Sequence, residues 1–242
     1  MSSPFQKIYR YCRGDGSLTL AVGILILFAF ALYPMVEVGM VSRIWLDIVF
    51  ALFMAMGAAF VFEPRPLVRT FLTVLVIAVA LSFVNHFYEN GWVLIARSVA
   101  AILACLFLGW LLLVRVMRDG RINVNRIMGA IGSFLLIGIV FGNLYRVLAW
   151  SIDGAFAIGG TPADFDQVRH LLTYFSFITL TSTGYGDITP LHPYARSLAA
   201  LEALSGTLFL TVLVARLVGL EMEWREEQRA RKRDGKEDHA ST

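Results

Sequence analysis

The sequence predicts an all-α membrane protein with six transmembrane helices and one shorter re-entrant helix. Hydrophobic residues make up 57% of the 242 residues and the mean hydropathy is +0.68, whereas a soluble domain has about 45–50% apolar residues. Only 16% of residues are charged, and they gather between apolar runs. A bilayer core of about 30 Å requires about 20 apolar residues in a helix, and six runs have about that length.

The elements follow one another in a simple order. The predicted spans are residues 18–36, 44–62, 67–84, 92–114, 127–150 and 194–220. The first run lacks a small-residue cleavage site, so we expect it to remain as an anchor. A further apolar run, residues 168–180, is too short to span and is expected to enter the membrane and return on the same side. The segment at 151–166 contains several glycines and is expected to be an outer loop.

The positions of lysine and arginine predict the orientation. Most of the 21 basic residues lie before the first span, in the loops 63–66 and 115–126, and after the last span. Both termini are therefore expected in the cytoplasm of a cell whose inner membrane the chain crosses several times. The net charge of +3 reflects these flanks, so we expect membrane lipids and no nucleic acid as partners. Residues 234–242, which are dense in charge, are expected to be disordered.

Residues 181–187, Thr-Ser-Thr-Gly-Tyr-Gly-Asp, follow the short apolar run and precede the last span. A dehydrated cation needs a dense cage of oxygen atoms, and a peptide supplies one when successive carbonyls face one axis. Glycine adopts φ > 0 at little steric cost, and Gly184 and Gly186 stand at alternate positions. The Ser182 hydroxyl is expected to add another oxygen at the inner end. The motif therefore predicts a cation site made of backbone.

This motif, preceded by the aromatic run 174–180 and followed by Asp187, resembles the selectivity filter of tetrameric potassium channels. The usual signature there is Thr-Val/Thr-Gly-Tyr-Gly, so Ser182 departs from it and Thr183 is an accepted variant. The resemblance covers residues 127–220 with specific motifs, and residues 18–117 only in span count and topology. The chain is thus similar to bacterial six-transmembrane potassium channels.

The resemblance implies a homotetramer, because one chain supplies one filter strand and cannot enclose an ion. It implies that K+ is held at Ser182, Thr183, Gly184 and Tyr185, with Gly186 completing the ion-binding filter. Residues expected to support the filter are Tyr174, Phe175, Thr181 and Asp187. Tyr174 and Phe175 are expected to meet the ring of Tyr185, and Asp187 to hydrogen-bond behind the filter at the outer mouth. Gly206 is either a hinge of the pore-lining helix or a site of close helix packing.

The domain boundaries follow from the spans. Residues 1–17 form a cytoplasmic N-terminus, 18–117 a four-helix unit like a voltage sensor, 118–126 a cytoplasmic linker, 127–220 the pore domain and 221–242 a charged cytoplasmic tail. A voltage sensor needs arginine at every third position, but the series from Arg97 continues Ala100, Leu103 and Leu106. Gating by voltage is therefore not expected. Arg97 is expected to pair with an outer acid: Glu37, Asp47 or Glu89.

The function implied is passive, potassium-selective conduction, with a non-selective monovalent cation channel as the alternative. A six-span hydrolase is not expected, because Ser133 and Ser205 have no histidine in a suitable span. A non-conducting scaffold is a third hypothesis. Glu202 within the last span is costly unless partnered and either bonds the re-entrant helix or faces the cavity. No cofactor and no small-molecule substrate are expected, and the sequence does not indicate what opens the channel.

Overall fold

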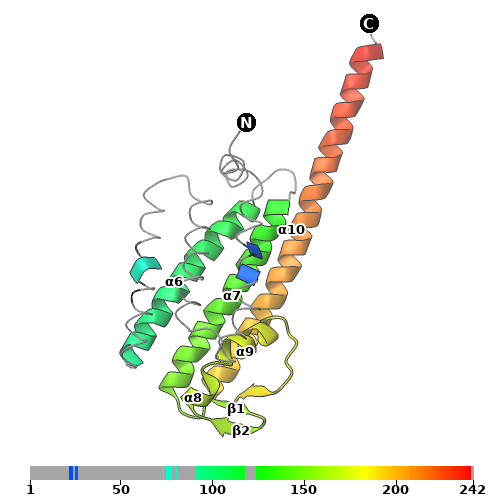
Figure 1. The fold of residues 1–242 in the computed structure, drawn as a ribbon. Helices are drawn as coiled ribbons and strands as arrows, with labels where there is room; N and C mark the ends of the chain where they lie inside the picture. The colour runs from blue at the N-terminus through cyan, green and yellow to red at the C-terminus, as the bar shows by residue number, and fades with distance from the viewer. Residues whose placement is uncertain are drawn as a thin grey trace, which may run out of the picture.

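A computed structural model of the chain describes residues 22–23, 25–26, 73, 75–77, 80, 91–117 and 124–240. Helices dominate, and a small sheet lies at one end of them (Figure 1). The elements are α6 (Gly91–Val116), α7 (Val124–Ser151), β1 (Phe156–Ile158), β2 (Thr161–Ala163), α8 (Phe165–Val168), α9 (Leu172–Leu180), β3 (Ile188–Pro190) and α10 (Pro193–Ala240).

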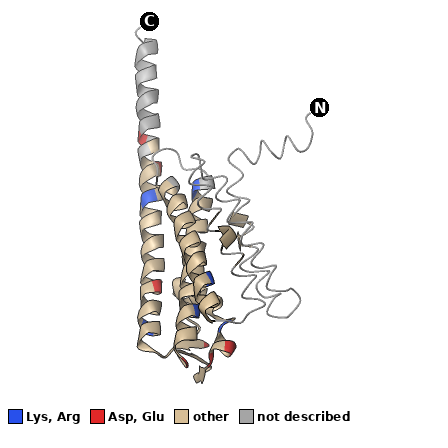
Figure 2. Cartoon of the chain, turned by 90° about the vertical axis from the view of Figure 1, so that its left-hand side faces the viewer, with Lys and Arg blue, Asp and Glu red and all other residues tan. Residues whose placement is uncertain are grey.

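Three helices in this part of the chain are long and apolar enough to cross a membrane. They cover Gly91–Val114, Arg126–Ser151 and Pro193–Met222, within two residues of the spans expected at 92–114, 127–150 and 194–220. Charged residues are sparse along these helices (Figure 2). The spans expected at 18–36, 44–62 and 67–84 lie outside the described residues except for short helical pieces. The count of six spans therefore stays a prediction.

α7 lies between α6 and α10 (Figure 1). Its contact with α6 is a leucine-rich cluster, in which Leu108 and Leu112 of α6 meet Leu136 of α7. Leu25 and Leu75, from the described pieces of the first and third predicted spans, belong to the same cluster. These pieces therefore pack against the α6–α7 pair.

The outer segment that the sequence predicted as a loop contributes two strands to a small antiparallel sheet, which corrects the all-α expectation. Its strand order is β2-β1-β3. β1 and β2 are joined through Gly159 and Gly160, with φ of 57° and 84°, and Ile158 pairs with Thr161. Two successive residues with positive φ form the turn that matches the twist of a hairpin. β3 pairs with the other edge of β1, so the hairpin is hydrogen-bonded to the chain just after residue 187.

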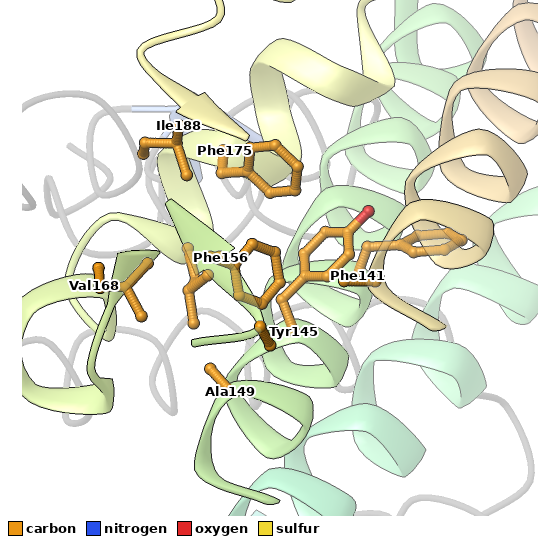
Figure 3. Close-up of a cluster of buried hydrophobic side chains, with 11 residues drawn as sticks. Phe141, Tyr145, Ala149, Phe156, Val168, Phe175 and Ile188 are labelled. Carbon is orange, nitrogen blue, oxygen red and sulfur yellow. The ribbon is translucent and has the colours of Figure 1, made fainter. Parts of the chain in front are cut away.

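An aromatic cluster lies behind this sheet, between α7 and α9 (Figure 3). The ring of Tyr145 lies 5.7 Å from that of Phe156 and 5.0 Å from that of Phe175, and both pairs are edge-on. All three side chains are buried. Edge-to-face ring pairs stabilise the fold beyond the burial of their apolar surface, so this cluster fixes the position of α9 against α7 and the sheet.

α10 has 48 residues and extends well beyond the other helices at its C-terminal end (Figure 1). The expectation that residues 234–242 are disordered is therefore wrong as far as Ala240. The physical reason lies in the preceding residues 221–233, which consist almost entirely of the strong helix formers glutamate, glutamine, arginine, lysine, methionine and alanine, so the helix is already formed where 234–240 begin. High charge of both signs does not prevent a helix that is already nucleated by the preceding span.

Candidate ion filter

Segment 181–187 is built directly on the C-terminal end of α9. The amide groups of Thr183 and Gly184 both donate to the carbonyl of Ile178, at 2.8 and 3.1 Å, and that of Ser182 donates to Thr179 at 2.9 Å. These bonds satisfy carbonyls that a helix end leaves without partners. The first half of the segment therefore takes its position from α9.

The backbone of the segment alternates between positive and negative φ. Ser182, Gly184 and Gly186 have φ of 56°, 53° and 80°, and the residues between them have negative φ. A regular strand points successive carbonyls to opposite sides, whereas alternation of the sign of φ allows successive carbonyls to point to the same side. Ser182 is the one non-glycine residue with positive φ in the described chain, a conformation that costs an L-residue about 1–2 kcal/mol. The sequence predicted positive φ at the two glycines but not the backbone strain at Ser182.

Every residue from 181 to 187 is exposed in the single chain, whereas Ile188 is buried. The side chain of Tyr185 is 73% exposed. Phe175, expected to meet that ring, packs instead into the cluster with Tyr145 and Phe156. Within one chain the structure does not bring Phe175 and Tyr185 together.

Tyr174 and Asp187 do come together. The Tyr174 hydroxyl hydrogen-bonds the Asp187 side chain, and desolvation, followed by this bond, raises the pKa of Tyr174 above its ordinary value. The amide of Gly159 donates to the carbonyl of Asp187 at 2.9 Å. The outer end of the segment is therefore held from two sides, by α9 and by the hairpin. Sequence reasoning missed the hairpin contact, although the Gly159–Gly160 pair is a known hairpin signal.

Thr181 is held at the inner end by its own side chain. Its Oγ1 donates to the carbonyl of Phe177 at 2.7 Å and lies 2.9 Å from Oγ1 of Thr183. The hydroxyls of Thr181 and Thr183 thus bond to each other, and that of Thr181 also bonds to α9.

Two residues of α10 face α9. A Cβ on Gly206 would overlap the carbonyl oxygen of Leu180, so the close-packing interpretation of this glycine describes the structure. Glu202 is fully buried and accepts hydrogen bonds from Ser176 of α9 and Tyr145 of α7. Of the two expectations for Glu202, the structure has the bond to α9, the helix that the sequence predicted to be re-entrant.

Arg146 of α7 also touches α9, donating to Asn143 at 3.0 Å and to Thr173 at 3.4 Å. The acids expected to pair with Arg97, namely Glu37, Asp47 and Glu89, lie outside the described residues. That pairing stays a prediction.

Comparison with known proteins identifies the class of protein. Residues 170–222, which hold α9, the exposed segment and the first part of α10, match the family model described as "Ion channel". Protein LctB of Bacillus caldotenax is 31% identical over 107 residues, which is 43% of this chain and 79% of that protein. No solved structure matches the chain.

The chain therefore belongs to the ion channel family and is a helical membrane protein. It is a channel and not an enzyme.

Proposed function

We propose that this channel conducts K+ passively through a filter formed by residues 182–186 of four copies of the chain. The observation that carries the proposal is the alternating backbone, with positive φ at Ser182, Gly184 and Gly186. A K+ filter needs carbonyls that replace the hydration shell of the ion from one side of the chain. The other support is the exposure of the whole segment 181–187, which leaves its oxygens available to an ion.

A homotetramer is part of the proposal. One strand of carbonyls cannot surround an ion, and closed symmetry supplies the others. The spanning part of α10 is only 11% buried in the single chain, against 61% for α7. It exposes a long row of apolar residues: Leu201, Leu204, Leu208, Leu210, Val212, Val214 and Val218. Neighbouring copies and lipid tails are suitable partners for such a surface.

Selectivity for K+ is favoured by the parts that hold the filter's shape. Tyr185 is retained in the motif, and its neighbourhood includes the bond from Tyr174 to Asp187. The proposed orientation follows from geometry and charge together. The sheet and the filter lie at the opposite end of α10 from its charged C-terminal part (Figure 1). With that part in the cytoplasm, the filter faces outward across the cell membrane.

Gating by something other than voltage is also proposed, because the helix α6 has arginine only at positions 97 and 115. α10 is continuous through Gly206. As a hinge, Gly206 would have to bend while leaving the carbonyl of Leu180, so opening is proposed to involve movement at this contact.

The test is ion flux through the purified protein in liposomes, driven by K+ or by Na+ gradients, with barium as blocker. Barium-sensitive flux that prefers K+ is expected. Equal flux of both ions would establish the non-selective alternative. The filter variant Gly184→Ala, at φ 53°, is expected to lose the flux. The matched variant Gly219→Ala, whose Cβ meets nothing within 4 Å, is expected to keep it.

A further inference from the structure

Glu202 lies where three helices meet and is 0% exposed. Its Oε2 lies 2.5 Å from the hydroxyl of Tyr145 on α7, and its Oε1 lies 2.5 Å from the hydroxyl of Ser176 on α9. The same Ser176 hydroxyl lies 2.6 Å from the carbonyl oxygen of Gly138 on α7. Three short oxygen–oxygen contacts therefore form one chain across α10, α9 and α7.

Each of these contacts requires a proton between its two oxygens. Tyr145 supplies one proton and Ser176 supplies one, and the Gly138 carbonyl supplies none. An ionised Glu202 supplies none either, so one pair of oxygens would face each other with no proton between them. A protonated Glu202 supplies the third. Its O–H then donates to Ser176, and Ser176 donates to Gly138, while Tyr145 donates to the other carboxyl oxygen.

The surroundings of Glu202 agree with this count. Among the described residues, the groups that bond to its carboxyl group are the hydroxyls of Tyr145 and Ser176, and no basic side chain forms an ion pair with it. Arg146 of α7 donates to Asn143 and Thr173 instead. An ionised carboxylate buried within a membrane span without a cation is very costly.

We propose that Glu202 is a neutral carboxylic acid that fastens the pore-lining helix to the re-entrant helix through a proton-bearing chain, Glu202 to Ser176 to Gly138. Removal of its proton at alkaline pH leaves the pair Ser176–Gly138 or the pair Glu202–Ser176 without a hydrogen. The negative charge then has at most two hydroxyl donors and no counter-charge. The contact between α10 and α9 is weakened in that state.

The position of this contact gives it a role in conduction. Ser176 stands four residues before Leu180, and Glu202 stands four residues before Gly206. The contacts Glu202–Ser176 and Gly206–Leu180 thus lie one turn apart on both helices. Glu202 is a positioning residue, because it sets the helix that carries the filter and does not itself reach the ion. This role rests on the proposed function, whereas the protonation state does not.

The protonation state is tested by infrared difference spectroscopy on the full chain at neutral pH, wild type against Glu202→Gln. Glutamine mimics the neutral acid, with an N–H for Ser176 and a carbonyl for Tyr145. The difference spectrum is expected to show loss of the carbonyl stretch of a protonated carboxylic acid. Loss of carboxylate bands instead would overturn the proposal. The matched control, Glu226→Gln on the exposed surface of α10, is expected to lose carboxylate bands.

A second variant keeps the test decisive if Glu202→Gln fails to assemble. Ser176→Ala removes the acceptor of the acid proton, so the acid carbonyl band of the wild type is expected to shift. An unshifted band would contradict the chain of contacts. Ser133→Ala is the matched control, because that buried hydroxyl bonds the carbonyls of Gly129 and Gly109 and no carboxyl group.

The functional role is tested by the pH profile of K+ flux in liposomes. Wild-type flux is expected to fall at alkaline pH, and Glu202→Gln is expected to conduct with a flatter alkaline limb. Identical profiles would overturn the positioning role. Absence of flux in all variants, together with an acid band in the infrared spectrum, would contradict the proposed conduction and leave the protonated state of Glu202 established.

Discussion

Gly206 of α10 lies directly against Leu180, the last residue of α9. A Cβ at Gly206 would overlap the carbonyl oxygen of Leu180 and lie 3.0 Å from its carbonyl carbon and its Cδ1. The obstacle is mostly backbone, which cannot rotate away as a flexible side chain does. The residue after Leu180 begins the exposed filter segment. The close approach of α10 to the filter therefore depends on the absence of a side chain at position 206.

Gly206→Ala is therefore expected to destabilise the assembled channel. The added methyl has to displace α10 from α9, and overpacking of this kind costs about 1–3 kcal/mol. The measurement is the Tm of the protein in detergent, with the oligomer followed by size-exclusion chromatography. A drop of several degrees is expected, together with lower K+ flux.

Gly219→Ala is the matched control on the same helix. No atom of the chain lies within 4 Å of a Cβ at that position. Alanine is favoured over glycine in a helix by about 1 kcal/mol, so an unchanged or higher Tm is expected. Equal Tm values for the two variants would show that the contact with Leu180 does not limit stability.

The second prediction concerns Ser182, which holds φ at 56° without being a glycine. If its hydroxyl is a ligand, both Ser182→Ala and Ser182→Gly weaken K+ binding. Ser182→Gly also relieves about 1–2 kcal/mol of backbone strain, which the greater freedom of the unfolded chain partly offsets. The two variants should thus share a loss of affinity and differ in stability without K+.

The rise of Tm with K+ concentration measures this affinity, because a bound ion stabilises the folded state in proportion to its binding. Both variants are expected to show a smaller rise than the wild type. Ser205→Ala serves as the control, because that hydroxyl bonds Leu201 within its own helix at 2.7 Å. A wild-type K+ response in Ser182→Ala would exclude the hydroxyl as a ligand.

Local patterns predicted much of this fold. Apolar length placed α6, α7 and the spanning part of α10 within two residues, because a membrane requires long apolar helices. The short run before the motif became α9. Glycines at alternate positions anticipated positive φ at Gly184 and Gly186. Each of these features depends on residues adjacent in sequence.

Contacts between distant segments were beyond such reasoning. β3 is three residues long and pairs with β1, which lies thirty residues earlier, and so short a strand has little sequence signal. The packing of Phe175 against Tyr145 and Phe156 depends on how α7, β1 and α9 meet. The partners of Glu202 likewise come from two other helices. Helical continuation through residues 234–240 was also beyond such reasoning, because dense charge does not distinguish a disordered tail from the continuation of an existing helix.

The third prediction concerns the bond from Tyr174 to Asp187. Tyr174→Phe keeps the ring and removes the hydroxyl, so the outer end of the filter loses its tie to α9. Compared with the wild type, this variant is expected to show a smaller K+-dependent rise in Tm and a K+ flux that declines faster with time. Because the pKa of Tyr174 is raised, the bond is expected to persist as pH rises through the ordinary tyrosine range, near 10. It is lost only at higher pH.

A wild-type response of Tyr174→Phe to K+ would mean that the hairpin alone holds Asp187. Tyr194→Phe is a suitable control. Tyr194 is exposed, and its ring packs at a tilt against that of His192 beyond the filter. It is expected to leave the K+ response unchanged.

The fourth prediction concerns the hairpin. The Gly159 amide donates to the Asp187 carbonyl at 2.9 Å, while β1 and β3 pair next to it. Gly159→Pro removes this N–H and is expected to loosen the filter's outer end, which lowers selectivity for K+ over Na+ in the liposome assay.

Gly160→Pro provides the comparison, because both residues have positive φ and proline is strained at either one. Both variants distort the hairpin turn, and only the first deletes the donor to Asp187. A larger loss of selectivity in Gly159→Pro than in Gly160→Pro is expected. If the two variants lose selectivity equally, the shape of the turn matters and the single bond does not. If neither loses it, the sheet has no part in holding the filter, and the tie from Tyr174 is left as its outer support.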